Sequence, residues 1–204
     1  MFSGIVQGTG EVSKVISKKG YISIEINPPK NFNKSLKKGA SISVDGVCLT
    51  SVDKGIKKLR FDVIEETISR TNIKAIKKGS VVNLERSIKA STEIGGHLMS
   101  GHIHCTGKIK KILNKNSTKD IIVEFPKKFK EYIFEKGYIG LNGCSLTLGK
   151  VNKASFYLHL IPETLLVTNL DKLKTGSLVN IEIDQNTISV VETVKNTLAA
   201  QKSR

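Results

Sequence analysis

The sequence predicts an all-β protein made of two tandem six-stranded antiparallel barrels and a C-terminal α-helix. Three observations predict this fold. The chain repeats itself once, each copy contains six short β-branched segments, and a helical pattern begins only after the second copy ends. We therefore expect an N-terminal barrel at 1–96, a C-terminal barrel at 97–186 and a helix at 187–204.

The repeat has a constant shift of 97 residues, so that Ser3 returns as Ser100 and Glu66 returns as Glu163. The matched blocks are SGIVQGTG (3–10) with SGHIHCTG (100–107), DGVCLT (45–50) with NGCSLT (142–147), ETISRTN (66–72) with ETLLVTN (163–169), and GSVVNLE (79–85) with GSLVNIE (176–182). This period exceeds the ~20–50 residues of a solenoid unit and suits a small domain of ~100 residues. Two similar domains predict two similar pockets.

Short β-branched segments bounded by Gly, Asn, Pro or Lys predict the strands. They lie at 5–16, 21–26, 40–44, 47–53, 58–64 and 80–85, and again at 103–113, 120–125, 138–141, 144–151, 155–161 and 178–183. The segment 21–26 alternates apolar and polar residues, as a half-buried strand does. Six such strands separated by turns are typical of a small antiparallel barrel.

Helical patterns occur at three places. One helical turn stands between the fifth and sixth strands of each copy, near 65–71 and 162–168, and Pro162 suits the first turn of the second one. The tail after the second copy has apolar residues at every third or fourth position, namely Ile188, Val191, Val194 and Leu198. This stripe either caps a barrel or packs against copies of itself. We favour self-association, because the repeated unit offers the tail no partner and a narrow stripe suits a coiled seam.

The composition is that of an ordinary globular protein, with 39% hydrophobic and 25% charged residues. The net charge of +15 raises the possibility of nucleic-acid binding. However, the lysines come in pairs spread along the chain at apparent turns, and aromatic residues make up only 5%. Since stacking on bases requires aromatic side chains in a basic groove, we expect no nucleic-acid partner.

The sequence also indicates where the protein works. It has no apolar run near the ~18 residues of a membrane span, and its first residues lack the features of a signal peptide. The three cysteines, Cys48, Cys105 and Cys144, are few and odd in number. We therefore expect no disulfide framework, no membrane partner and a cytoplasmic location.

Several of these blocks resemble riboflavin synthase, over essentially the whole chain and in the same order. The motifs that carry the resemblance are MFSGIVQGTG (1–10), DGVCLT (45–50), EIGGHLMSGH (93–102), NGCSLT (142–147), LIPETL (160–165) and VNIEID (179–184). The resemblance implies two six-stranded Greek-key barrels and a trimer formed through the C-terminal helix. It also implies that the active site lies between the N-terminal barrel of one subunit and the C-terminal barrel of its neighbour.

The resemblance implies a transferase that completes riboflavin biosynthesis. Two molecules of 6,7-dimethyl-8-ribityllumazine react, and a four-carbon unit passes from one to the other. The products are riboflavin and 5-amino-6-(D-ribitylamino)uracil, and no cofactor or metal is implied. The repeat agrees with this reaction, because a dismutation needs two copies of one compound in two similar pockets. Lumazine synthase, which makes the substrate, is a candidate partner that the sequence leaves open.

The two copies differ where unlike chemistry is needed. At matched positions Ile5 becomes His102, Cys48 becomes Ser145, and Ser87 becomes Asp184. His102 follows Gly101 at a predicted strand start, and a histidine can take or orient the 7-methyl proton of a lumazine.

The other candidate catalytic residues carry nucleophiles or a charge. Ser145 and Thr147 share one strand face, so their hydroxyls can hold the pteridine edge or direct a nucleophile. Cys48 is either a nucleophile toward the ring or a small buried thiol. Asp184 either binds a ribityl hydroxyl or polarises Ser145 or His102.

The resemblance also implies which residues bind substrate. The segments 62–67 and 161–166 are expected to line the two pockets, and Lys136 to contact a ligand. The full set is Gly4, Ile5, Val6, Ser41, Cys48, Leu49, Thr50, Asp62, Val63, Ile64, Glu65, Glu66, Thr67, Gly101, His102, Ile103, Lys136, Ser145, Leu146, Thr147, Ile161, Pro162, Glu163, Thr164, Leu165 and Leu166.

Two other interpretations remain. Non-catalytic relatives hold a lumazine or flavin as a chromophore, and loss of the reactive set in the second half would mark that class. A metal site formed by His97, His102, His104 and Cys105 is disfavoured, because no second ligand group follows at the spacing of a metal site. His159 is predicted to be an ordinary strand residue.

Overall fold

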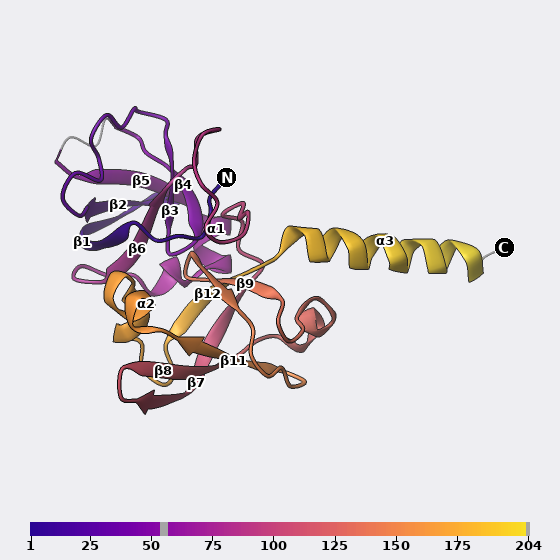
Figure 1. Cartoon of the computed structure of the whole chain (residues 1–204). Helices are drawn as coiled ribbons and strands as arrows, with labels where there is room; N and C mark the ends of the chain where they lie inside the picture. Colours follow the sequence, from indigo (N-terminus) through magenta and orange to yellow (C-terminus); the bar gives the residue numbers. More distant parts are fainter. Residues whose placement is uncertain (54–56, 203–204) are drawn as a thin grey trace.

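The computed structural model describes residues 1–53 and 57–202. It contains two six-stranded antiparallel sheets and one long C-terminal helix, as predicted (Figure 1). The first sheet consists of β1 (Gly8–Lys18), β2 (Tyr21–Asn27), β3 (Ser41–Val44), β4 (Val47–Thr50), β5 (Leu59–Ile64) and β6 (Val81–Arg86). The second consists of β7 (Cys105–Lys115), β8 (Thr118–Glu124), β9 (Tyr138–Leu141), β10 (Cys144–Thr147), β11 (Ser155–Leu160) and β12 (Leu178–Ile183).

Both sheets have the same topology, β4-β3-β6-β1-β2-β5 in the first and β10-β9-β12-β7-β8-β11 in the second. Isolated bridges from Ser51 to Phe61 and from Val151 to Phe156 join the two ends of each sheet, which closes it into a barrel. The long first strand of each barrel has a bulge at the same place, after Val12 and after Ile109. A bulge bends a strand and so helps a small sheet to close.

The helical turns also lie where they are predicted. The short helices α1 (Glu65–Arg70) and α2 (Pro162–Val167) each follow the fifth strand of their barrel. Each continues into a short 3₁₀ helix, η1 (Asn72–Ala75) or η3 (Asn169–Lys172). The second barrel has one more, η2 (Lys127–Tyr132).

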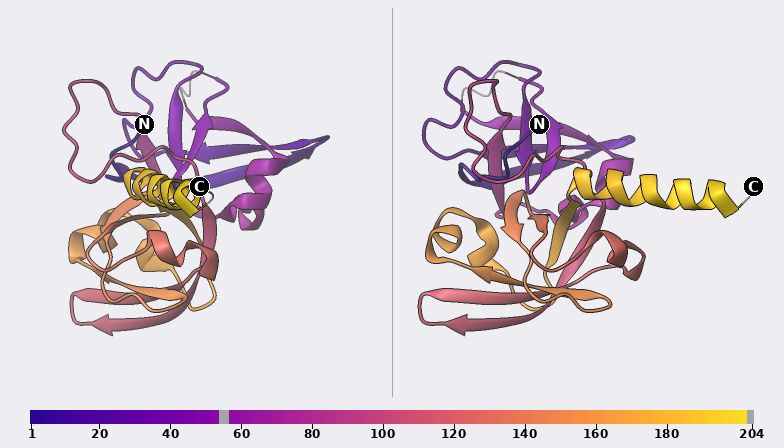
Figure 2. Two further views of the ribbon diagram at one scale, coloured as in Figure 1. Left: turned by 90° about the vertical axis from the view of Figure 1, so that its right-hand side faces the viewer. Right: turned by 45° about the vertical axis from the view of Figure 1, so that its right-hand side comes forward.

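The C-terminal helix α3 (Gln185–Lys202) projects away from both barrels (Figures 1 and 2). It begins two residues earlier than predicted, and the expected residues 203–204 lie outside the described part of the chain. Ile188 packs against the second core, whereas Val194 and Leu198 are about half exposed at 52% and 53%. Within the described residues, no helix is long and apolar enough to cross a membrane.

The segments that precede the barrels exchange places. Residues 1–7 and 98–104 are here called arm 1 and arm 2, and they lie outside the strands, whereas the sequence predicted strands from 5 and 103. Phe2 and Met99 pair with each other through two backbone hydrogen bonds of 2.8 and 3.0 Å. Beyond this pair, Val6 of arm 1 belongs to the core of the second barrel and Ile103 of arm 2 packs against the core of the first. Each barrel is therefore completed by the arm of the other.

A buried polar cluster joins the two barrels through hydrogen bonds. Its members are Asp45, Asn72, Asn83, Asn142, Asn169 and Asn180, and all are buried. The contacts are reciprocal: the backbone N–H of Asn72 donates to Asn180 Oδ1 at 2.7 Å, and that of Asn169 donates to Asn83 Oδ1 at 2.6 Å.

The glycines beside this cluster explain how closely the barrels approach. A Cβ on Gly46 would lie 2.7 Å from the backbone nitrogen of Gly143, and a Cβ on Gly143 would lie 2.7 Å from that of Gly46. The two turns therefore meet backbone to backbone, and both positions require glycine, also because their φ angles are +82° and +79°.

The cluster contains one carboxylate, and Asn142 takes the matching place in the second copy. Asp45 accepts hydrogen bonds from Asn83, Asn72 and Asn169. Complete burial nevertheless raises its pKa from 3.8 to about 6, because loss of hydration outweighs these three hydrogen bonds. A second aspartate at 142 would add another buried charge to the same contact.

This raised pKa predicts a pH-dependent stability. A folded-state pKa above the unfolded value stabilises the fold at low pH, and the contribution is lost as the pH rises through about 6. The difference of roughly two pH units corresponds to about 3 kcal/mol. The free energy of unfolding is measured by urea titration at several pH values from about 4 to about 7. Between these two pH values it should fall by about 3 kcal/mol more in the wild type than in Asp45→Asn. Asn142→Ala, which removes a hydrogen bond but no charge, should keep the wild-type pH dependence. Equal slopes for wild type and Asp45→Asn would contradict this explanation.

Candidate functional site

The crossed arms reach the two strands on which the reactive side chains are predicted. The backbone N–H of Cys48 on β4 donates to the carbonyl of Gly101 at 2.9 Å, and the N–H of Ser145 on β10 donates to the carbonyl of Gly4 at 2.8 Å. His102 therefore lies next to the strand of Cys48 in the first barrel, and Ile5 next to the strand of Ser145 in the second. The sequence placed His102 at a strand start of the second barrel, which is wrong: β7 begins at Cys105, and His102 belongs to arm 2.

Both contacts require glycine in the arm. A Cβ on Gly101 would lie 2.5 Å from the Cβ of Cys48, and a Cβ on Gly4 would lie 2.5 Å from the Cβ of Ser145. Their φ angles are +82° and +73°, a region that glycine adopts without strain. The arms can therefore lie directly on the reactive strands.

Two buried glutamates hold the arms in place. Glu85 on β6 accepts hydrogen bonds from the N–H and hydroxyl of Ser3 at 2.7 and 2.8 Å and from the N–H of Gly4 at 3.1 Å. Glu182 on β12 accepts the same set from Ser100 and Gly101, at 2.6, 2.8 and 3.1 Å. Burial raises the pKa of both carboxyl groups, and the hydrogen bonds from the arms oppose this effect. The sequence contained a signal for this role, because the same glutamate ends an apolar strand in both copies.

The second barrel has a cavity of about 540 Å³ that gathers many of the predicted binding residues. It lies between β10 and the end of β11. Its lining residues are Glu135, Lys136, Ser145, Leu146, Thr147, Leu148, Gly149, Lys150, His159, Ile161 and Thr164. Pro162, Glu163, Leu165 and Leu166 belong to the adjacent helix α2 and do not line this cavity.

Ser145 has a partner that the sequence did not predict. His97 Nδ1 lies 2.7 Å from Ser145 Oγ, and the imidazole stacks on the ring of Tyr138 with centroids 5.2 Å apart. His97 is 8% exposed, and in the described part of the chain its Nε2 has no hydrogen-bond partner. Burial lowers the pKa of His97, and the charge of Asp184 partly opposes this effect. A neutral imidazole in this position can accept the hydroxyl proton of Ser145.

Asp184 has a structural role next to this pair. Its carboxylate accepts hydrogen bonds from the N–H and the hydroxyl of Thr187 at 2.9 and 2.8 Å, which caps the first turn of α3. The charge of Asp184 also acts on His97. That Asp184 binds a ribityl hydroxyl or polarises Ser145 or His102 stays a prediction.

The first barrel presents the matching residues in a similar arrangement. Cys48 is half-buried on β4, and Thr50 on the same strand pairs with Ser41 of β3. On β5, Asp62 and Ile64 are exposed, and Val63 between them is buried. The remaining predicted residues, Glu65, Glu66 and Thr67, begin α1.

Cys48 is the accessible thiol of the chain. Cys105 and Cys144 are buried, and burial raises the pKa of each to about 12. Since the thiolate is the reactive form, these two cysteines are inert at neutral pH.

The four residues of the metal alternative do not form one ligand set. His97 contacts Ser145, His104 Nδ1 accepts the N–H of Ile183 at 3.1 Å, and Cys105 lies in the second core. Among residues 1–53 and 57–202, no three His, Cys, Asp or Glu side chains are placed to hold a metal ion.

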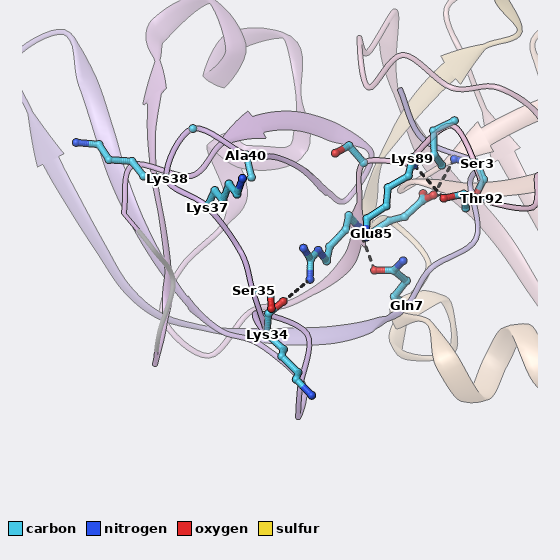
Figure 3. Close-up of a pocket in the computed structure, with 14 residues that line it drawn as sticks. Ser3, Gln7, Lys34, Ser35, Lys37, Lys38, Ala40, Glu85, Lys89 and Thr92 are labelled. Carbon is cyan, nitrogen blue, oxygen red and sulfur yellow. Dashed lines mark hydrogen bonds between the residues drawn. The ribbon is translucent and has the colours of Figure 1, made fainter.

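A further cavity, of about 1030 Å³, lies on the first barrel (Figure 3). Lys34, Lys37, Lys38 and Lys89 line it, and Arg86 donates to the carbonyl of Lys34 at 2.8 Å. None of the predicted site residues lines it. Glu85, which also lines it, holds arm 1.

The chain matches the model of the lumazine binding domain twice, at residues 3–87 and 100–184. It is 43% identical over 204 residues to the riboflavin synthase of Escherichia coli (strain K12), covering 100% of this chain and 96% of that protein. The riboflavin synthase of Chlamydia pneumoniae is 42% identical over 200 residues, covering 98% of each chain.

Solved structures of similar fold include LumP in complex with riboflavin, with a TM-score of 0.85, and LumP in complex with 6,7-dimethyl-8-(1'-D-ribityl) lumazine, with a TM-score of 0.83. Both are 28% identical to this chain and cover 91% of it and 100% of LumP.

The glutamate anchors predict a test with the accessible thiol. Glu182→Gln keeps the shape of the side chain but weakens the charge-assisted hydrogen bonds that hold arm 2 over Cys48. We expect Cys48 to react with a thiol reagent several-fold faster in this variant than in the wild type. Glu85→Gln releases arm 1 from the other barrel and should leave the rate unchanged. The reaction rate is measured from the absorbance of the reporter group that the thiol releases. Equal rates in all three proteins would contradict the crossed-arm arrangement.

Proposed function

Because the chain belongs to the riboflavin synthase family, we propose that it converts two molecules of 6,7-dimethyl-8-ribityllumazine into riboflavin and 5-amino-6-(D-ribitylamino)uracil. The observation that carries this proposal is a pair of matching strands with unlike reactive groups, Cys48 on β4 and Ser145 on β10, each hydrogen-bonded to the arm of the other barrel. The reaction requires such a pair, because one lumazine gives up a four-carbon unit and the other receives it. Full-length similarity to riboflavin synthases supports the same reaction.

The two pockets offer different chemistry to the same heterocycle. The first presents Cys48 with His102 from arm 2, and the second presents Ser145 with His97 behind it. His102 can donate a hydrogen bond or a proton to the lumazine bound in the first barrel. Ser145, held by His97, and Thr147, on the same strand face, can hold the pteridine edge.

We further propose that three chains assemble through α3 (187–204 in the expected domain division). Val190, Val194 and Leu198 form an exposed apolar stripe, and the exposed ends of the pockets at Ile64 and Ile161 leave room for a neighbouring barrel. In this arrangement the barrel at 1–96 of one chain faces the barrel at 97–186 of the next. Holding both reactants aligned can lower a barrier by roughly 7–11 kcal/mol.

The direction of α3 is set by its own barrel. Tyr132 of η2 donates to Glu192, and Lys195 pairs with Glu131. The ring of Tyr132 also lies under the ammonium of Lys195, 5.0 Å from it. The stripe is therefore held clear of the second barrel. We assign the protein to the cytoplasm, which its three free cysteines support.

Turnover separates this function from that of a chromophore-binding protein. Incubation with 6,7-dimethyl-8-ribityllumazine should give riboflavin continuously, followed by its fluorescence. His102→Ala should slow turnover about 10²-fold or more, the usual contribution of general acid–base catalysis. Ser145→Ala and His97→Gln should slow turnover by similar factors. The variant that carries both of these changes should be no slower than either alone, because the two side chains act as one pair. Binding of one lumazine per pocket without product would support the chromophore class instead.

Removal of the helix tests the shared site. A chain that ends at residue 186 should sediment as a monomer and retain a small fraction of the wild-type activity, because each pocket then lacks its facing partner. Val194→Asp and Leu198→Asp should have the same effect, whereas Asn196→Asp, also on α3 but outside the stripe, should leave the assembly unchanged. A monomer with full activity would refute the trimeric site.

A further inference from the structure

One swap between the two copies was not recognised in the sequence. At the shift of 97 residues, His159 in the second barrel matches Asp62 in the first. Both stand near the end of the fifth strand: Asp62 opens the predicted binding segment 62–67, and His159 lies two residues before the segment 161–166. His159 lines the cavity of the second barrel together with Ser145, Thr147 and Lys136. The matched positions therefore carry an imidazole in the second barrel and a carboxylate in the first.

His159 is held in one orientation by a buried carboxylate. Its Nδ1 lies 2.7 Å from Oδ1 of Asp120, which is its direct partner across β8 and β11. Asp120 is 6% exposed, and its other oxygen pairs with Lys115 Nζ at 2.5 Å. The hydrogen bonds to Lys115 and His159 lower the pKa of Asp120, so it is ionised at neutral pH. An ionised Asp120 accepts the Nδ1–H of His159 and leaves Nε2 with its lone pair.

Gly149 leaves room around that nitrogen. A Cβ on Gly149 would lie 2.8 Å from His159 Nε2, and the residue also lines the cavity. The first copy has none of this arrangement: Gly149 is matched by Val52, and Asp120 by Ser23, which pairs with Asp62. Carboxylate, imidazole and the space beside it thus occur together in one barrel only.

The sum of the other charges near these positions differs in the same direction. Lys136 and Lys150 line the cavity of the second barrel, against Glu135. In the first copy Lys136 is matched by Gly39 and Lys150 by Asp53, and Glu65 is matched by Pro162 in the second. Glu66 is matched by Glu163, and only Glu135, matched by Lys38, differs in the opposite direction. An anion is therefore favoured in the second pocket and disfavoured in the first.

We propose that His159, oriented by Asp120, removes the 7-methyl proton of the lumazine held in the second barrel. The C–H bond breaks, its electron pair passes into the pteridine ring to give the exocyclic methylene anion, and the proton goes to Nε2 of His159. Asp120 stabilises the imidazolium that forms, as a buried carboxylate does for a catalytic histidine. The lumazine in the first barrel stays neutral and is the one attacked. This assignment rests on the proposed function.

Hydrogen exchange at the 7-methyl group tests the proposal without requiring turnover. The full-length protein is incubated with 6,7-dimethyl-8-ribityllumazine in D₂O, and deuterium in the recovered substrate is measured by mass spectrometry alongside riboflavin formation. We expect the wild type to accelerate exchange above the rate of the free compound. His159→Gln, whose amide can still donate to Asp120, should lower the accelerated exchange about 10²-fold or more.

Controls separate a catalytic from a structural role. Asp120→Asn should also lower exchange, because it loses the charge that stabilises the imidazolium. Ser23→Ala, at the matched place in the first barrel, should exchange at the wild-type rate. Riboflavin binding, followed by fluorescence quenching, should be kept in His159→Gln.

The outcomes are distinct. Wild-type exchange in His159→Gln would overturn the proposal, and wild-type protein that forms no riboflavin would overturn the proposed function instead. If His159→Gln fails to fold, Gly149→Ala keeps the imidazole but crowds Nε2. Undiminished exchange in that variant would equally overturn the proposal.

Discussion

The crossing of the two arms is the constraint on which the rest of this structure depends. The N–H of each reactive residue, Cys48 or Ser145, donates to the arm of the other barrel. Neither barrel is therefore complete without the arm of the other, since Val6 and Ile103 also pack against the opposite cores. Glycine is required where the arm touches the strand, and Glu85 and Glu182 hold the arm at that distance. The two barrels cannot vary independently, since a shift of one would displace the pocket of the other.

The two barrels have the same fold but carry different reactive side chains. The barrels share their topology, their bulges and their arm contacts, so matched residues take the same places in both. Single side chains then make them unequal. Asp45 and Asn142 do so at the contact between the barrels, where two carboxylates would both be buried. Asp62 and His159 do so at the proposed lumazine sites. The second barrel then favours an anionic lumazine and the first a neutral one, as the donor and the acceptor of the four-carbon unit require.

The proposed assembly of three chains would cover surfaces that the single chain leaves exposed. The helix α3 is attached to the second barrel by the hydrogen bond from Tyr132 to Glu192, and its apolar stripe remains exposed. The exposed ends of both pockets are apolar as well. A neighbouring chain would cover these surfaces together, which connects the burial of apolar area to the closing of the site.

The sequence by itself determined the elements. Period-two alternation, turn residues and the exact repeat are local or internal signals, and they predicted twelve strands, two helical turns and the tail helix close to their observed bounds. The strand starts at 5 and 103 and the place of His102 were predicted wrongly, because an arm that crosses to another barrel has the same apolar pattern as a strand. Only the tertiary structure paired His97 with Ser145 and Asp120 with His159, which are 48 and 39 residues apart. Such pairs depend on which strands become neighbours when the barrel closes, and that closure leaves no periodic trace in the chain.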